Sequence, residues 1–343
     1  MKKKLALLGF GNAGKAFTRL LLEKRDIIRE EYASDVVVTA VSTRSRGSLV
    51  SEKGLDIADI LRRSEQTGRL SDDKNLSELS ALEIAKQADY DVLIEMTPLN
   101  IFTGQPAISH IEAAFERGKD VITANKGPVA WKFADLKEKA ARKGCKFFYE
   151  TTVMDGTPVF NLAEKTLKLA RVTEVSGILN STTNFILEEM VKGAEYDDIM
   201  ARGRSRGFIE ADPAMDIEGY DAAAKITALL NVLMDAHMTP DMVERKGIED
   251  ITIEDIRKAE ERGNVIKLLC SGQRDEDGRV RARVGPEEIP GGHLLASIDS
   301  TTSAVSITTD LMKKITIVEH EPEIEQTAYG IFGDLLRLSL IHI

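Results

Sequence analysis

The feature that most limits how this chain can fold is a short apolar segment that runs directly into three closely spaced glycines. Residues 3–8 have the composition of a buried strand, and residues 9–14 follow at once with the pattern Gly-x-Gly-x-x-Gly. Helix-forming residues with an apolar face then occupy residues 16–24. A strand, a glycine turn and a helix in this order are typical of a fold in which the helix amino terminus faces a phosphate group.

Each glycine of this turn has its own structural reason. The first permits a tight turn, the second lets the backbone approach a pyrophosphate, and the third lets the helix pack on the strand. The sequence therefore predicts a dinucleotide-binding turn made of Gly9, Phe10, Gly11, Asn12, Ala13 and Gly14. A purely structural glycine turn is the alternative, because this pattern alone also occurs by chance.

The first half of the chain continues as an alternation of strands and helices. Apolar or β-branched runs predict strands at residues 36–41, 92–94, 120–123 and 146–149, and helices are predicted at residues 108–117 and 132–142. This alternation predicts a parallel sheet of the Rossmann type, in which ligands bind at the carboxyl ends of the strands. Thr97 and Thr123 lie at two such ends, and we expect both to contact the cofactor.

Chain length and a change of rhythm predict two domains. The 343 residues exceed the roughly 250 to 300 that one core supports. We expect a Rossmann dinucleotide-binding domain over residues 1–150 and an α+β domain with a mixed or antiparallel sheet over residues 151–325. A closing amphipathic helix, at about residues 326–343, is expected to pack back on the first domain. The predicted fold class is therefore α/β with an α+β second domain.

Composition excludes several classes of protein. The formal net charge is −10 and the basic residues are scattered, which argues against a nucleic-acid partner. The longest apolar runs fall far short of the roughly 20 residues that span a bilayer, and no signal peptide is recognisable, so we expect no membrane partner and a cytoplasmic protein. Cys145 and Cys270 lack the surroundings of a metal site or a nucleophile and are interpreted as ordinary reduced thiols.

The residues after the second predicted strand bear on the choice of nucleotide. A site that prefers NAD usually has Asp or Glu there, whereas this chain has Ser, Thr and Arg at residues 42–46. A guanidinium can stack on adenine and form two hydrogen bonds with a phosphate, so Arg44 favours NADP, and Arg69 is a second candidate. Either could instead be a plain surface arginine, and NAD is kept as a possible cofactor.

One lysine follows an acidic stretch in the second half of the chain. If a helix begins near Asp221, this residue and Lys225 are four positions apart and share a face. A surface ion pair is the alternative, but the apolar residues around the pair favour partial burial. A buried lysine with one partner is a candidate proton donor or acceptor.

This stretch resembles homoserine dehydrogenases. The family carries the pattern Glu-x-Asp-Pro-x-x-Asp-x-x-Gly-x-Asp-x-x-x-Lys, which is matched here by Glu210, Asp212, Pro213, Asp216, Gly219, Asp221 and Lys225. An Asn-Lys pair after the fourth strand of the family's nucleotide domain is similar to Asn125-Lys126 here. Residues 150–158 and 177–187 also resemble the family, and residues 327–336 do so more faintly.

The resemblance implies a reaction and a role for each matched residue. The reaction is the NADP-dependent interconversion of L-homoserine and L-aspartate 4-semialdehyde, in the biosynthesis of threonine, methionine and isoleucine. Lys225 would exchange a proton with the substrate, Asp221 would orient it, and Lys126 would lie near the nicotinamide. Glu210 would bind the substrate ammonium and Asp216 would help to hold the substrate.

The family also implies an ion, an assembly and a domain content. A monovalent cation such as sodium maps to Glu150, Val153, Asp155 and Thr157. The second domain would serve both catalysis and dimerisation, which gives a homodimer. Some members carry a kinase domain or a ligand-binding ACT domain, and we expect the short monofunctional form without either.

One region departs from the family and motivates an alternative function. Many members have a glycine-rich loop before the last helix, whereas residues 318–326 contain four glutamates here. Their bulk and charge would hinder a polyanionic cofactor unless the loop is displaced. The alternative is a catalytically weak, NADP-binding regulatory paralogue. A second alternative is a semialdehyde dehydrogenase that oxidises its substrate through a thiohemiacetal. Such an enzyme needs an activated cysteine, and neither Cys145 nor Cys270 has suitable surroundings.

Overall fold

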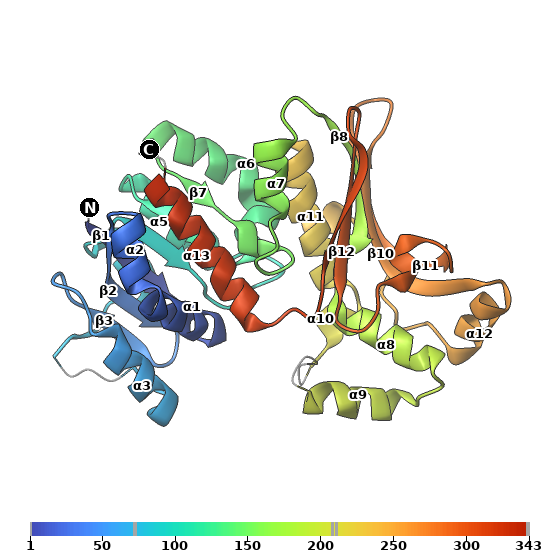
Figure 1. The fold of residues 1–343 in the computed structure, drawn as a ribbon, viewed down its shortest axis with the longest axis horizontal. Helices are drawn as coiled ribbons and strands as arrows, with labels where there is room; N and C mark the ends of the chain where they lie inside the picture. Colours follow the sequence, from blue (N-terminus) through green and yellow to red (C-terminus); the bar gives the residue numbers. More distant parts are fainter. Residues whose placement is uncertain (1, 71–73, 207–208, 210–211, 341–343) are drawn as a thin grey trace. The chain divides into compact units, whose positions relative to one another are not determined.

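The computed structural model describes residues 2–70, 74–206, 209 and 212–340, and its chain forms two compact units (Figure 1). Unit 1 comprises Met1–Pro158 and Glu323–Ile343, and unit 2 comprises Val159–Pro322. The sequence placed the division at residue 150, at the end of the last strand. Unit 1 extends further because the segment after that strand packs on the closing helix, where the Glu150 amide donates to Asp334 at 3.1 Å.

Unit 1 contains a seven-stranded sheet in the order β4-β3-β2-β1-β5-β6-β7. Its strands are β1 (Lys2–Leu8), β2 (Asp35–Thr43), β3 (Gly47–Val50), β4 (Leu76–Ser77), β5 (Val92–Glu95), β6 (Asp120–Thr123) and β7 (Phe147–Phe148). The prediction of a parallel sheet is correct for five strands and wrong for the edge. There β3 and β4 run antiparallel to their neighbours, because the chain reverses directly after β2 through Gly47, at a φ of +94°.

Helices cover both faces of this sheet. They are α1 (Asn12–Glu23), α2 (Arg25–Glu31), α3 (Ile57–Thr67), α4 (Ala81–Gln87), α5 (Ala107–Glu116), α6 (Lys126–Lys143) and α13 (Ile324–Leu340), with the short η1 (Glu150–Thr152). Leu5 and Leu7 of β1 join one core with α1 and α13, and Ala6 and Leu8 join the other with α4, α5 and α6. This alternation follows the two-residue period of a strand. Figure 1 shows α13 beside α1.

Two helix starts differ from the sequence prediction. α1 begins at Asn12, directly after the glycine turn, rather than at residue 16. α6 begins at Lys126 rather than at residue 132, because the Asn125 side chain caps it and Pro128 lies in the first turn, where its missing N–H is not needed. The non-helical backbone of Lys132 marks a kink at the predicted start.

Unit 2 contains a six-stranded mixed sheet in the order β13-β12-β8-β10-β11-β9. Its strands are β8 (Val172–Ile178), β9 (Glu244–Arg245), β10 (Asn264–Arg274), β11 (Val280–Pro290), β12 (Ser303–Thr309) and β13 (Lys313–Glu319). Only β9 pairs in parallel among the described strands of this sheet. Its helices are α7 (Val159–Thr166), α8 (Ser181–Val191), α9 (Tyr196–Ser205), α10 (Ala214–Ile217), α11 (Tyr220–Met234) and α12 (Ile253–Glu261), with η2 (Pro240–Met242) and η3 (Leu294–Ser297).

The centre of unit 2 is α11, which packs against β8, β10 and β11. Gly272 of β10 makes this possible, because a Cβ there would lie 2.5 Å from both Cδ atoms of Leu230. The glutamate-rich region is less of a loop than the sequence suggested: Glu319 ends β13 and is buried, and α13 begins at Ile324. Within the described residues, no helix has the length and apolar character needed to cross a membrane.

Candidate active site

The glycine turn lies where the strand order of unit 1 reverses, between the carboxyl ends of β1 and β5. The Gly9 amide donates to the Ser42 carbonyl at 2.8 Å, and the Met96 amide donates to the Leu8 carbonyl at 2.7 Å. These bonds join the ends of β1, β2 and β5. Such a crevice is where open α/β sheets bind dinucleotides.

The three glycines differ in what surrounds them. Gly9 has a φ of +100°, and a Cβ there would lie 2.3 Å from the Met96 carbonyl oxygen. A Cβ on Gly14 would lie 2.7 Å from the Gly9 oxygen, whereas nothing lies within 4 Å of one on Gly11. Open space beside Gly11, directly before α1, is what the approach of a pyrophosphate requires. Phe10 is buried in the core, so it presents only its backbone.

Both candidate arginines are exposed at the carboxyl end of β2. Arg44 lies in the turn between β2 and β3, and Arg69 follows α3. The Leu70 amide donates to the Arg46 carbonyl at 3.3 Å, which brings the Arg69 segment beside that turn. The structure therefore brings the segments that carry these two arginines together at the edge where the adenosine ribose of a Rossmann domain lies.

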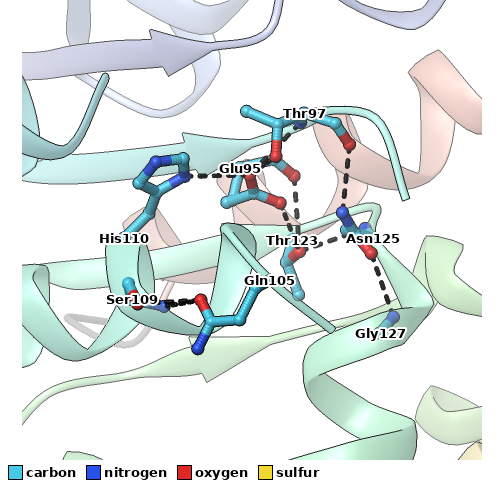
Figure 2. Close-up of polar contacts among 8 residues, drawn as sticks. All are labelled: Glu95, Thr97, Gln105, Ser109, His110, Thr123, Asn125 and Gly127. Carbon is cyan, nitrogen blue, oxygen red and sulfur yellow. Dashed lines mark hydrogen bonds and ion pairs between the residues drawn. The ribbon is translucent and has the colours of Figure 1, made fainter. Parts of the chain in front are cut away.

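Thr97 and Thr123 lie at the carboxyl ends of β5 and β6 (Figure 2), and Lys126 is the first residue of α6, which follows β6. Asn125 links them: its amide N–H donates to the Thr123 hydroxyl at 3.0 Å and its Nδ2 donates to the Thr97 carbonyl at 3.0 Å. Its Oδ1 accepts from the Gly127 amide at 3.0 Å, which caps α6 at the turn that begins with Lys126.

The predicted lysine and carboxylate meet in unit 2. Lys225 Nζ lies 3.1 Å from Asp221 Oδ2 and donates to the Leu179 carbonyl at 2.7 Å. Asn180 Nδ2 donates to Asp216 at 2.7 Å and to Asp221 at 3.0 Å, so one amide bridges two carboxylates. Glu210 lies outside the described residues.

Burial and neighbouring charges shift the pKa values of this cluster. The pKa of Asp216 is raised, first by burial and then by the charge of Asp221, while Asn180 and Lys225 act in the opposite direction. Burial also raises the pKa of the Cys270 thiol to about 12, and it raises the pKa of Cys145. Neither thiol is therefore activated as a nucleophile.

The candidate cation ligands lie in one short segment of unit 1. Glu150 and Val153 are buried, and Met154 and Asp155 have positive φ values of 55° and 45°. The Thr327 hydroxyl donates to the Asp155 carboxylate. No group of three or more His, Cys, Asp or Glu suited to a metal ion occurs in the described part of the chain. One buried carboxylate with nearby backbone oxygens is a donor set that fits a hard ion of low charge.

Comparisons with known proteins agree with this arrangement. A family model described as homoserine dehydrogenase matches residues 158–336, and one described as the NAD-binding domain of homoserine dehydrogenase matches residues 9–150. An NAD(+)-dependent homoserine dehydrogenase of Pseudomonas canavaninivorans is 35% identical over 98% of this chain and 96% of its own. The chain belongs to the homoserine dehydrogenase family. It is thus an NAD(P)-dependent oxidoreductase that acts on a hydroxyl group, as the resemblance predicted.

Solved structures of homoserine dehydrogenases have the same fold as this chain. A putative homoserine dehydrogenase from Archaeoglobus fulgidus has a TM-score of 0.87 and 34% identity, covering 98% of this chain and 99% of its own. A hyperthermophilic archaeal homoserine dehydrogenase mutant in complex with NADPH has a TM-score of 0.84 and 25% identity, covering 99% and 98%. The amino-terminal domain is therefore a nucleotide-cofactor domain.

Sequence reasoning missed the groups that hold the predicted residues in this homoserine dehydrogenase. Leu179 and Asn180 lie 46 and 41 residues from their partners Lys225 and Asp221. No local spacing connects such positions. The available signals were that both residues directly follow β8, at its carboxyl end, and that they lie in the stretch 177–187 that resembles the family.

Proposed function

We propose that this enzyme interconverts L-homoserine and L-aspartate 4-semialdehyde, with NADP as the preferred cofactor and Lys225 as the proton-transferring residue. The observation that carries the proposal is the largely buried Lys225–Asp221 pair, whose side chains are 19% and 13% exposed. Asp221 and the Leu179 carbonyl fix the position of the Lys225 ammonium group, so this group can donate a proton to one defined substrate atom.

The reaction balances with one proton and one hydride. When bound, the nicotinamide supplies a hydride to the aldehyde carbon. The Lys225 ammonium donates a proton to the aldehyde oxygen, which becomes the alcohol of homoserine, and in the reverse direction the amine takes that proton back. Asp221 stabilises the charged form of Lys225 before the proton is donated, and holds its Nζ in place.

Three further residues receive roles toward the substrate and cofactor. Asp216 helps to hold the amino-acid substrate, and Glu210 binds its ammonium group. Lys126, the first residue of α6, would lie near the nicotinamide when the cofactor is bound. Support for these roles is the family pattern together with the clusters that hold Asp216 and Lys126 in place.

The preference for NADP is inferred from the end of β2. Exposed Arg44 stands where an NAD-preferring site has a carboxylate, and Arg69 lies beside the same turn. The relatives differ: the Pseudomonas enzyme is named NAD(+)-dependent, and the hyperthermophilic archaeal structure holds NADPH. We further infer a homodimer through the sheet of unit 2, and a monovalent cation at Glu150, Val153, Asp155 and Thr157.

The test follows NADPH absorbance while purified protein reduces aspartate 4-semialdehyde, with NADH in parallel. Lys225→Ala should lower kcat by about 10² to 10⁴-fold, the range of acid–base catalysis. Arg44→Ser should raise KM for NADPH about tenfold and leave that for NADH unchanged, because only NADPH carries the 2′-phosphate. Arg142→Ser, which removes another exposed arginine of unit 1, is the control.

Each failure has a separate meaning. Binding of NADPH without turnover by the unmodified enzyme would favour the regulatory paralogue. A KM for NADPH that Arg44→Ser leaves unchanged would remove the argument for NADP but keep the reaction.

A further inference from the structure

A fully buried carboxylate lies at the centre of the polar cluster in Figure 2. Glu95, the last residue of β5, has no exposed surface, and His110 of α5 is 3% exposed. His110 Nδ1 lies 3.4 Å from Glu95 Oε1. Burying a carboxylate costs free energy unless hydrogen bonds or an opposite charge compensate. The groups that contact Glu95 must therefore supply this compensation.

Glu95 holds two threonines on two adjacent strands. Its Oε1 accepts from the Thr97 amide at 3.2 Å and from the Thr97 hydroxyl. Its Oε2 lies 3.4 Å from the hydroxyl of Thr123, the last residue of β6. Because the two oxygens of one side chain lie within hydrogen-bonding distance of both threonines, Glu95 links the carboxyl ends of both strands.

Asn125 carries this restraint into α6. Its backbone amide donates to the Thr123 hydroxyl and its Nδ2 to the Thr97 carbonyl, so both groups fixed by Glu95 determine where the Asn125 side chain lies. The same side chain caps α6 through the Gly127 amide. Lys126 stands between Asn125 and Gly127, and its backbone is therefore fixed from both sides.

The loop after Thr97 packs closely against α6. A Cβ on Gly127 would lie 2.8 Å from Gly104 Cα, so the two backbones touch. The Trp131 Nε1 donates to the Ile101 carbonyl at 2.8 Å. Because close-packed backbones transmit displacements, a shift at Thr97 would move this loop and the start of α6 together.

The position of His110 is set independently of Glu95. Gln105 Oε1 accepts from the Ser109 amide at 3.2 Å and from the Ser109 hydroxyl at 2.8 Å, which closes the first turn of α5. The His110 amide donates to the Pro106 carbonyl at 3.1 Å within that turn. α5 thus presents His110 to Glu95 from a rigid element.

We infer that Glu95, oriented by His110, is a positioning residue for hydride transfer. Glu95 fixes the position of Thr97 directly. It fixes the position of Lys126 through Thr123 and Asn125. The inference rests on the proposed place of Lys126 near the nicotinamide and on the expected contact of Thr97 with the cofactor. Glu95 acts through these groups and touches neither substrate nor cofactor.

Glu95→Gln tests this, because the amide keeps only one acceptor oxygen and therefore cannot accept the hydrogen bonds of both Thr97 and Thr123. We expect kcat to fall about 10- to 100-fold, as small misplacements near reacting atoms do. The primary deuterium isotope effect on kcat, with NADPH deuterated at C4, should rise because hydride transfer becomes slower. The Kd for NADPH, measured by its fluorescence, should change less than about threefold, since the phosphate-binding backbone at Gly9–Gly14 is untouched.

The matched control is Thr39→Val. Thr39 is a buried residue of the same sheet, and its hydroxyl donates to the Asp89 carbonyl at 2.6 Å, before β5 begins. It should lower the Tm and leave kcat and the isotope effect at wild-type values. His110→Asn, which keeps a nitrogen near the Nδ1 position, should retain most of the activity that His110→Leu loses.

The outcomes separate this inference from the proposed function. If Glu95→Gln lowers only the Tm, as Thr39→Val does, Glu95 is structural and the inference is wrong. If Lys126→Ala is slow while Glu95→Gln is not, the inference alone fails. If Lys126→Ala keeps the wild-type kcat, the proposed role of Lys126 is overturned.

Discussion

The glycine turn of unit 1 and the lysine cluster of unit 2 achieve their geometry by different physical means. At the turn, the backbone is the functional group, and Gly9 is required because any side chain would collide with the Met96 carbonyl. In the cluster, charged side chains are the functional groups, and Asn180 holds two carboxylates beside Lys225. A substitution at the turn should therefore act through steric collision. A substitution in the cluster around Lys225 should act through loss of charge compensation.

The largest effect is expected where the charge compensation of Lys225 is removed. Asp221→Asn should lower kcat about 100-fold, because the lysine loses the carboxylate that holds its charged form in a largely buried place. Steady-state kinetics with NADPH and aspartate 4-semialdehyde measure this. Glu254→Gln is the matched control, since Glu254 and Lys258 have the same spacing on α12 but are 64% and 54% exposed.

The control should keep the wild-type kcat, because exposed ion pairs of this spacing contribute only about 0.3–0.5 kcal/mol. Equal effects of the two substitutions would mean that burial does not distinguish the Asp221 pair. In that case charge compensation would not be what distinguishes the Lys225 cluster from the glycine turn.

The second largest effect concerns the turn. Gly9→Ala should lower the free energy of unfolding by roughly 2–4 kcal/mol, since it adds a Cβ 2.3 Å from the Met96 oxygen at a φ of +100°. Gly11→Ala meets no atom within 4 Å, so it should leave stability nearly unchanged and weaken NADPH binding about tenfold. Denaturant unfolding and NADPH fluorescence titration give the two quantities.

The two glycine substitutions also serve as controls for each other. A stable Gly9→Ala variant would show that the turn can relax around a side chain. Unchanged NADPH binding in Gly11→Ala would contradict the approach of a pyrophosphate to this backbone.

The sequence predicted best those features that depend on local spacing. The glycine turn, β6 and the Asp221–Lys225 pair all follow from residues close together in the chain. The edge strands β3 and β4 and the early start of α6 were missed. Strands of four and two residues are too short to show a periodicity, and Gly127-Pro128 resembles a helix breaker.

The supporting groups of both regions could not be predicted for a common physical reason. Glu95 follows an apolar run and would pass for the polar residue at the end of a strand, although it is fully buried. Its partner His110 is 15 residues away, and Asn180 is 36 residues from Asp216. Tertiary folding alone brings such residues together, whereas a motif records only neighbours in sequence.

The smallest effect is a shift in pH dependence within the lysine cluster. The pKa of Asp216 is raised by burial and by Asp221, and the Asn180 hydrogen bond opposes that rise. Asn180→Ser removes this bond but keeps a residue that can cap α8. The pKa of Asp216 should then rise further, while kcat/KM well above it changes less than about twofold.

The direction of the shift follows from the sign of the pKa change. We expect Asp216 to help to hold the substrate in its ionised form, so kcat/KM falls as pH decreases through its pKa, and Asn180→Ser should move this acid limb to higher pH. Because the pKa is raised on folding, the stability that Asp216 contributes is present at low pH and is lost as pH rises through the folded pKa. A limb that stays in place, measured with homoserine over the acid range, would show that Asn180 serves only as a helix cap and that the bridge between the carboxylates does not govern their charge.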